Sequence, residues 1–519
     1  MPRYFNTTGP SNPQMHYMLP PEARLPALLP FVEQHLYFVV HAARQTGKTT
    51  AMRAFAERLR GLGYAAVWAT LEVSQDVTEV ERAEPLWLET LEQAGRGQLG
   101  LEGQPPATRG FLKHSVGNRL NLFLRAWSEK LLVPLVLLLD EADVIRGPAM
   151  VSFLRQLRAG FVDRGMGKFP ISVALIGMRD LRDYLTQARD GTPLNPGSPF
   201  NIKSESLTLR NFTEAEVGEL YQQHTQDTQQ VFTPEAIQRA FYWTRGQPFL
   251  VNALARKAVM ELAPLPQPVT VEHINEAKEQ LILSRTTHLD ALGQRLREPR
   301  VAAVMQAVLL GDMDIPYDSD DYTYCVDLGL LNPVPGQAEP ANPLYREVLV
   351  RELTLRRQYN LPAPWWPWKT QEGKLDMPAL MDAFLRWWRE NAAIVEGNAT
   401  EGYLEAVPHL TLMAFLQRVV NGGGRIHREY AAGRDALDLV VEYAGERHVL
   451  EVKRIPPQRT GPDRTKEKGK MQLIRYLDTL GEEEGWLMIF DQRPGRTWKQ
   501  RLWKEEVQVQ GKRLHLRGA

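Results

Sequence analysis

Residues 42–50 read Ala42-Ala43-Arg44-Gln45-Thr46-Gly47-Lys48-Thr49-Thr50. They follow an apolar run at residues 36–41, which is long enough for a buried strand. They precede residues 51–62, where apolar side chains recur at helical spacing until Gly61. The stretch is therefore predicted to form a loop between a strand and a helix.

This loop matches the phosphate-binding pattern G-x-x-x-x-G-K-[ST] with one departure, because Ala42 stands where the first glycine belongs. In such a loop the backbone N–H groups face the phosphates, and Gly47 allows their close approach. Lys48 would bridge the β- and γ-phosphates, and Thr49 would hold Mg²⁺. An alanine serves at position 42 if its φ stays negative. We therefore expect residues 42–50 to bind ATP together with Mg²⁺.

A second motif supports the nucleotide site. Residues 135–139 form an apolar strand candidate, which is followed by Asp140 and Glu141. In open parallel sheets, ligands bind at the carboxyl ends of the strands, where Asp140 would lie. We expect Asp140 to hold Mg²⁺ and Glu141 to polarise the attacking water. A buried strand followed by solvated acids would explain these residues alone, but not their position downstream of the phosphate loop.

Three further strand candidates lie at residues 64–71, 171–176 and 206–209, with helical stretches between them. Strands that alternate with helices indicate a parallel sheet covered on both faces. Residues 213–290 are predicted to be helical, apart from a break at Thr244-Arg245-Gly246-Gln247-Pro248.

The order of these motifs resembles the AAA-like and STAND groups of P-loop ATPases. The resemblance implies an ATPase core at residues 1–212, a helical lid at 213–290 and a winged-helix-like domain at 291–357. It also implies a phosphate sensor after the strand at 171–176, for which Arg179 is the candidate, although a surface arginine at a strand end would look the same.

Two smaller expectations come from the same resemblance. The sequence Gly246-Gln247-Pro248 resembles the turn that opens the lid helix of STAND ATPases, although a proline at a helix start has a structural explanation of its own. Phe5 and Tyr17 are expected to pack near adenine.

A linker separates the N-terminal parts from the C-terminal part. Residues 361–368 read Leu361-Pro362-Ala363-Pro364-Trp365-Trp366-Pro367-Trp368. Three of these eight residues are prolines, and so many prolines cannot continue a helix. We place the linker at residues 358–378 and a further α/β domain at 379–519, so the fold class expected is an α/β multidomain protein.

The C-terminal domain carries a second constellation, made of Asp438 and Glu451-Val452-Lys453. Side chains alternate along a strand, so Glu451 and Lys453 share one face. Asp438 begins the preceding hairpin strand and can reach the same face, with Asp435 as its rival. A solvated Glu/Lys pair on a strand is the plainer alternative.

An aspartate followed by Glu-x-Lys, between two helices, resembles the PD-(D/E)XK nuclease family, with Leu437 in place of the proline. The resemblance implies a restriction-endonuclease-like domain. There Asp438 and Glu451 would hold Mg²⁺, and Lys453 would orient the attacking water. It also implies roles for Glu405 in the preceding helix and Gln472 in the following one.

Composition limits the partners. With 62 basic and 62 acidic side chains among 519 residues, a uniformly basic coat is excluded. Basic residues nevertheless gather after the Glu-x-Lys motif, where they suit phosphate contacts: Arg454, Arg459, Arg464, Lys466, Lys468, Lys470 and Arg475. A nucleic acid is the expected partner, DNA before RNA. No apolar run approaches the ~20 residues that a bilayer requires, and a single cysteine excludes internal disulfides, so a cytoplasmic location is expected.

The leading hypothesis is an ATPase fused to a Mg²⁺-dependent nuclease, regulated by nucleotide and suited to defence against foreign DNA or to mobile-element biology. The alternative is a STAND-like switch or scaffold whose C-terminal domain only binds nucleic acid or a partner. A ring-forming motor is a third reading, which would need nucleotide-dependent self-association and an arginine supplied by a neighbouring copy.

Overall fold

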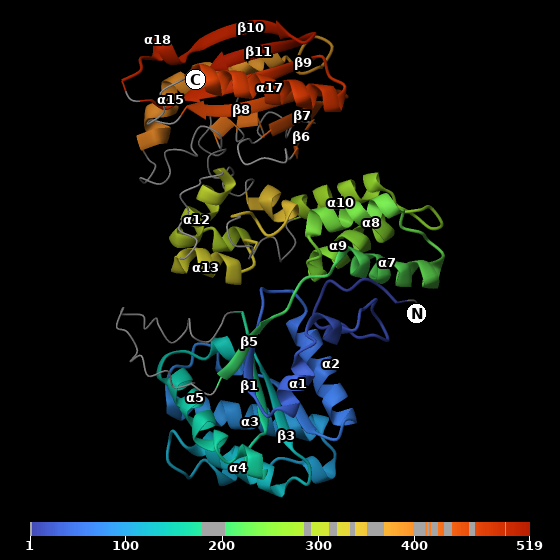
Figure 1. Ribbon diagram of the computed structural model, residues 1–519, viewed down its shortest axis with the longest axis vertical. Helices are drawn as coiled ribbons and strands as arrows, with labels where there is room; N and C mark the ends of the chain where they lie inside the picture. The colour runs from blue at the N-terminus through green and yellow to red at the C-terminus, as the bar shows by residue number, and fades with distance from the viewer. Residues whose placement is uncertain are drawn as a thin grey trace. The chain divides into compact units, whose positions relative to one another are not determined.

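A computed structural model describes residues 3–178, 203–284, 292–310, 319–332, 338–349, 368–397, 411–412, 415–416, 424–429, 438–455, 462–493 and 495–519. The chain divides into two compact units. The first contains Met1–His288, Val326–Leu331 and Ala341–Leu344, and the second contains the remaining residues. Figure 1 shows the helices and strands of both units.

The first unit is built on a parallel sheet with the strand order β2-β3-β4-β1-β5. Its strands are β1 (Tyr37–His41), β2 (Ala65–Thr70), β3 (Leu135–Asp140), β4 (Ser172–Gly177) and β5 (Lys203–Thr208). All five predicted strands are confirmed. β4 lies between β1 and β3, whereas β2 occupies an edge, so the two predicted nucleotide motifs lie at the ends of strands separated by one neighbour.

Both faces of this sheet are buried, as predicted. Alternate residues of β1 point to opposite faces, so Tyr37 and Val39 belong to one apolar core and Phe38 and Val40 to the other. The first core includes residues of α3 (Val80–Gln98), α4 (Arg119–Lys130) and α5 (Gly147–Phe161). The second includes residues of α1 (Leu28–Glu33) and α2 (Lys48–Gly61). Figure 1 shows these helices around the strands.

Helices follow the sheet, as predicted for residues 213–290 in their described part. They are α7 (Glu214–Thr228), α8 (Pro234–Thr244), α9 (Pro248–Lys257) and α10 (Val271–Leu283). Polar side chains start three of them: Thr213 caps α7, Thr233 caps α8 and Gln247 caps α9. Each accepts a hydrogen bond from a backbone N–H that would otherwise lack a partner.

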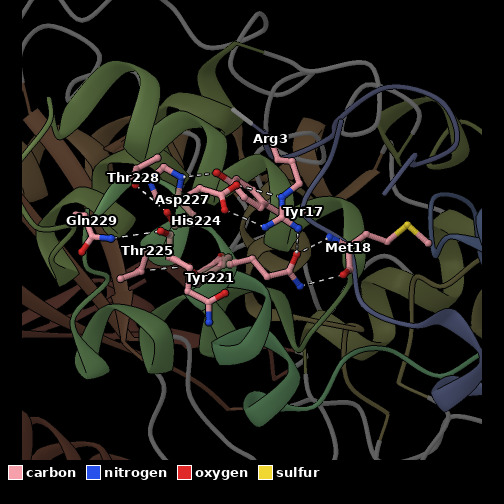
Figure 2. Close-up of polar contacts among 11 residues, drawn as sticks. Arg3, Tyr17, Met18, Tyr221, His224, Thr225, Asp227, Thr228 and Gln229 are labelled. Carbon is pink, nitrogen blue, oxygen red and sulfur yellow. Dashed lines mark hydrogen bonds and ion pairs between the residues drawn. The ribbon is translucent and has the colours of Figure 1, made fainter. Parts of the chain in front are cut away.

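The N-terminal segment packs on these lid helices. Arg3 donates through Nε and Nη2 to the carboxylate of Asp227 at 3.1 and 3.0 Å, and His224 Nδ1 lies 3.2 Å from the Tyr17 hydroxyl (Figure 2). Phe5 and Tyr17 are 1% and 2% exposed and pack against each other. Both rings are therefore buried by protein side chains. Their predicted position near adenine remains a prediction from the sequence.

The second unit contains a six-stranded mixed sheet with the order β10-β11-β9-β8-β7-β6. Its strands are β6 (Gly424–Glu429), β7 (Asp438–Tyr443), β8 (Glu446–Ile455), β9 (Glu484–Asp491), β10 (Trp503–Val509) and β11 (Lys512–Gly518). α17 (Pro462–Leu480) packs on the face that carries Val449 and Ile455. Trp388 of α15 (Met377–Gly397) contacts Phe490 of β9, so it packs in the core. Other described helices are α12 (Pro299–Leu310), α13 (Asp320–Asp327) and α18 (Trp498–Arg501).

Two features of this unit differ from the sequence prediction. The helix that the sequence predicts at residues 470–480, after the Glu-x-Lys motif, begins earlier, at Pro462, because its charged first turns have no clear apolar face. The hairpin of β10 and β11 was not predicted. Its signal is the alternation of Leu514 and Leu516 with polar residues after a turn at Gln510-Gly511, a pattern that the density of basic and aromatic residues obscured.

The N-terminal segment and the lid should loosen in acid. Burial lowers the pKa of His224, and burial together with Arg256 lowers the pKa of His16. Folding therefore makes both rings bind a proton less readily than they do in the unfolded chain, so the free energy of unfolding decreases as the pH falls through about 6.5. We expect a lower urea midpoint at about pH 5.5 than at about pH 7.5.

His224→Gln keeps a polar side chain and should reduce this difference between the two midpoints. His114→Gln, at an exposed position, is the control and should behave as the wild type does. Equal pH dependence in all three proteins would show that His224 does not cause the effect.

Candidate functional site

The phosphate loop begins α2 with a backbone that fits its sequence. Gly47 is the N-cap and has a φ of 88°, in the left-handed region that favours glycine. Ala42 is not among the residues with positive φ, and its N–H continues the β-ladder by donating to the Gly177 carbonyl at 3.3 Å. The departure at the first glycine position is therefore compatible with a phosphate loop.

Lys48 is bound inside the loop. Its Nζ donates to the carbonyl oxygens of Ala42 and Ala43 at 2.6 and 2.9 Å. Burial lowers the pKa of Lys48, while the nearby Glu141 carboxyl acts in the opposite direction. A buried cation bonded to neutral carbonyls gains from an anion placed beside it, so the loop is ready to accept a phosphate.

Thr49 and Asp140 meet across the sheet edge. The Thr49 hydroxyl donates to Asp140 Oδ2 at 2.7 Å. The indole of Trp68, on β2, donates to the same oxygen at 3.3 Å. Hydroxyl and carboxylate oxygens are the ligands that Mg²⁺ prefers, so these residues fit the cation that the loop implies. Sequence reasoning missed Trp68, because its approach depends on β2 being next to β3.

Glu141 follows Asp140 in a left-handed backbone conformation, with a φ of 55°. Burial raises the pKa of Glu141, and the carboxylates of Asp143 and Asp140 raise it further. Asp143 accepts a hydrogen bond from the Met178 N–H at 2.9 Å, which joins the ends of β3 and β4. Arg179, the sensor candidate, lies outside the described residues.

Segments distant in sequence also reach the loop. Gln247 Nε2 donates to the Gln45 carbonyl at 3.3 Å, and the Ser11 N–H donates to the Thr50 hydroxyl at 3.0 Å. Gly329 lies so close to Ala43 that a Cβ atom added to it would collide with that residue. None of these contacts was predicted, because they depend on tertiary packing.

In the second unit, β8 carries the Glu-x-Lys motif on its buried face. Glu451 and Lys453 are 0% and 5% exposed, and Lys453 Nζ lies 2.5 Å from Glu451 Oε1. Both residues alternate with Val452 and share the face that α17 covers. The prediction that the two side chains share a face is confirmed.

The neighbours of this pair are partly described. The ladder between β7 and β8 ends at Leu439 and Leu450, so the next positions, Asp438 and Glu451, are adjacent in the backbone. Gln472 lies on α17, and its Oε1 is buried without a hydrogen bond from the described residues. The side chain of Asp438, and the whole of Glu405 and Asp435, lie outside the described part.

The basic residues after the motif are partly engaged within the protein. Lys466 forms an ion pair with Glu505, and Lys470 pairs with Glu467 at 2.7 Å. The remaining described members of the cluster on α17 are exposed: Arg464, Lys468 and Arg475. Arg459 lies outside the described residues. Part of the predicted basic cluster is therefore already paired with acidic residues of the protein.

Comparison with known proteins identifies the first site. A family model described as an AAA domain matches residues 33–185, which contain the phosphate loop, Asp140 and Glu141. The chain therefore carries an AAA-like P-loop ATPase domain. A search of curated proteins found no match.

Several solved structures are similar to this chain. A Walker-type ATPase of Pyrococcus abyssi has 14% identity and a TM-score of 0.46, over 66% of this chain and 99% of its own. The ORC1 protein of Aeropyrum pernix in complex with DNA has 14% identity and a TM-score of 0.34, over 66% of this chain and 94% of its own. The RuvB Holliday junction branch migration motor of Thermotoga maritima has 14% identity and a TM-score of 0.34, over 63% of this chain and 92% of its own. Scores this low indicate nothing about what this chain binds.

Two searches of the described residues gave negative results. No helix among them is long and apolar enough to cross a bilayer. Nor do three or more His, Cys, Asp or Glu side chains converge there as a metal site. The statement about metal ligands does not include Glu405 or Asp435, since both lie outside the described residues.

Because Lys48 is buried, substituting it should abolish ATP binding without lowering the stability of the protein. Lys48→Met removes a cation whose pKa burial lowers, so the nucleotide-free protein should keep at least the wild-type melting temperature. The variant should lose the upward shift in melting temperature that ATP with Mg²⁺ gives the wild type. Differential scanning fluorimetry measures both. An ATP-dependent shift of wild-type size in the variant would contradict a role for Lys48 in binding.

Proposed function

We propose that this protein binds and hydrolyses ATP in its first unit and cleaves nucleic acid, DNA before RNA, with the Glu451–Lys453 site of its second unit. Each site places a buried lysine beside oxygen ligands suited to Mg²⁺. When bound, Mg²⁺ would neutralise phosphate charge and lower the pKa of a water. Nucleotide state would regulate the cleavage through self-association of the chain, in a role suited to defence or mobile-element biology.

At the ATP site, each residue has a distinct task. Lys48 exchanges the Ala42 and Ala43 carbonyls for phosphate oxygens. Thr49 and Asp140 hold the cation, with the Trp68 indole fixing the orientation of the Asp140 carboxylate. Glu141, half-buried beside them, orients the attacking water and accepts its proton. Arg179 is proposed as the sensor on the evidence of its place in the sequence alone.

One observation supports the nuclease proposal above the rest. Within the described residues, Lys453 is the ion-pair partner of the buried Glu451 carboxylate at Oε1, and neither Glu451 Oε2 nor Gln472 Oε1 accepts a hydrogen bond. Buried polar atoms without partners are rare and indicate a ligand or water that belongs there. Asp438 and Glu451 would hold Mg²⁺, and Lys453 would stabilise the charge that develops on the phosphate. Glu405 is retained as a further ligand on the resemblance alone.

The Lys453–Glu451 ion pair also supports the alternative function. A closed pair that needs no metal suits a STAND-like switch whose second unit binds nucleic acid or a partner without cutting. This alternative predicts that the protein slows the migration of DNA in a gel by binding it, while the DNA stays intact. The nuclease proposal predicts cleavage that depends on Mg²⁺.

Glu141→Gln should separate ATP binding from hydrolysis. The amide keeps the size of the side chain but cannot accept the proton of water, so hydrolysis should fall ~100-fold or more. Affinity for ATP, measured by equilibrium titration, should stay within a few-fold of the wild type. Glu57→Gln, the same substitution at an exposed position of α2, should leave both quantities unchanged. Wild-type turnover in Glu141→Gln would sink the assigned role.

Substitutions at Glu451 and Lys453 test the nuclease. Glu451→Gln or Lys453→Met should lower the cleavage of circular DNA with Mg²⁺ by ~100-fold or more. Either change leaves one buried charge alone and lowers stability. The double variant removes both charges, so it should remain folded by circular dichroism while staying inactive. Assays with ATP, ADP and no nucleotide report the coupling between the two units.

Glu483→Gln changes an exposed carboxylate outside the basic cluster and serves as the control, because it should cut at close to the wild-type rate. A double variant that cuts DNA as fast as the wild type would remove the nuclease proposal. Intact DNA with every protein, including the wild type, would favour the alternative.

A further inference from the structure

The side chain of Gln247 lies between the lid and the phosphate loop. Its Oε1 accepts a hydrogen bond from the Leu250 N–H at 2.7 Å, which caps the N-terminus of α9. Its Nε2 donates to the Gln45 carbonyl at 3.3 Å. The side chain is 5% exposed, so solvent does not readily replace either partner. A single amide group therefore holds a helix start with one atom and the phosphate loop with the other.

The Gln45 carbonyl belongs to the loop whose hydrogen bonds a bound phosphate would change. Lys48 Nζ is bonded to the Ala42 and Ala43 carbonyls, and a phosphate would compete with them for this cation. Gln45 itself has a φ of 59°, which is uncommon for a residue other than glycine. Gln45 lies between these two carbonyls and Lys48 in the chain, so we expect its carbonyl to shift when Lys48 exchanges them for a phosphate.

The turn before α9 is packed too tightly to absorb such a change. Gly246 has a φ of 71°, and a Cβ atom there would collide with the Phe212 carbonyl. The Phe212 N–H donates to the Gly246 carbonyl at 2.9 Å. This contact fixes the turn against the segment that leads into the lid. A displacement of Gln247 is therefore transmitted to the first turn of α9.

We propose that Gln247 is a positioning residue that couples occupancy of the phosphate loop to the start of α9. A shift of the Gln45 carbonyl would move the amide through its Nε2 hydrogen bond. The same movement would alter the hydrogen bond that Oε1 accepts from the Leu250 N–H. This inference rests on the proposed ATP binding and identifies the route from that site to the lid.

Substitutions at Gln247 separate its two bonds. Gln247→Glu keeps an acceptor for the Leu250 N–H but loses the donor to Gln45. Gln247→Ala loses both. Thr233→Ala is the matched control, since it removes a cap of the same kind, the bond from the Ala236 N–H at 3.2 Å, from the neighbouring helix α8.

Hydrogen–deuterium exchange of the full chain, with and without ATP and Mg²⁺, measures the coupling. A pH of about 8 keeps an introduced glutamate ionised. In the wild type, ATP should change exchange in the first turn of α9. In Gln247→Glu, exchange without nucleotide should match the wild type, and the ATP-dependent change should be lost. Gln247→Ala should exchange faster there even without nucleotide, whereas Thr233→Ala should keep the ATP response at α9.

Two results would overturn the coupling: an ATP response of wild-type size at α9 in Gln247→Glu, or a wild type that binds ATP without any change at α9. Binding itself is followed separately by equilibrium titration with ATP. A wild type that does not bind ATP would contradict the proposed function at its first step, so the two failures are distinguishable.

Discussion

The hydrogen bond between Thr49 and Asp140 joins two parts of the chain that lie 91 residues apart. It forms only because β1 and β3 run parallel with β4 between them, which brings their carboxyl ends to one edge of the sheet. Burial of both sheet faces fixes that arrangement, since a shift of one residue would turn apolar side chains away from their cores. The nucleotide site is thus a consequence of the packing of the strands.

The two candidate sites stabilise a buried lysine with different kinds of partner. Lys48 is bonded to neutral carbonyls of its own loop, so an incoming phosphate offers it a stronger partner. Lys453 already has the carboxylate of Glu451 beside it. A phosphate there competes with an existing ion pair, unless a divalent cation takes over the carboxylate. The first site can therefore accept an anion without breaking an ion pair, whereas Lys453 in the second is already paired with a carboxylate.

The sequence was sufficient to predict the features that depend on local pattern. Apolar runs placed the five strands of the first sheet, and the glycine-lysine-threonine sequence placed the loop before α2. Alternation along β8 placed Glu451 and Lys453 on one face. Contacts such as Trp68 with Asp140, or Gln247 with Gln45, could not be predicted, because they depend on which elements become neighbours in space. The hairpin of β10 and β11 was not predicted, although Leu514 and Leu516 alternate with polar residues.

The contact between Gly329 and Ala43 has a consequence for biosynthesis. A ribosome makes the phosphate loop long before it makes the glycine that presses against it. A nascent chain therefore presents the loop without that neighbour, and a nucleotide that arrives early meets a less crowded site than one that arrives after synthesis is complete.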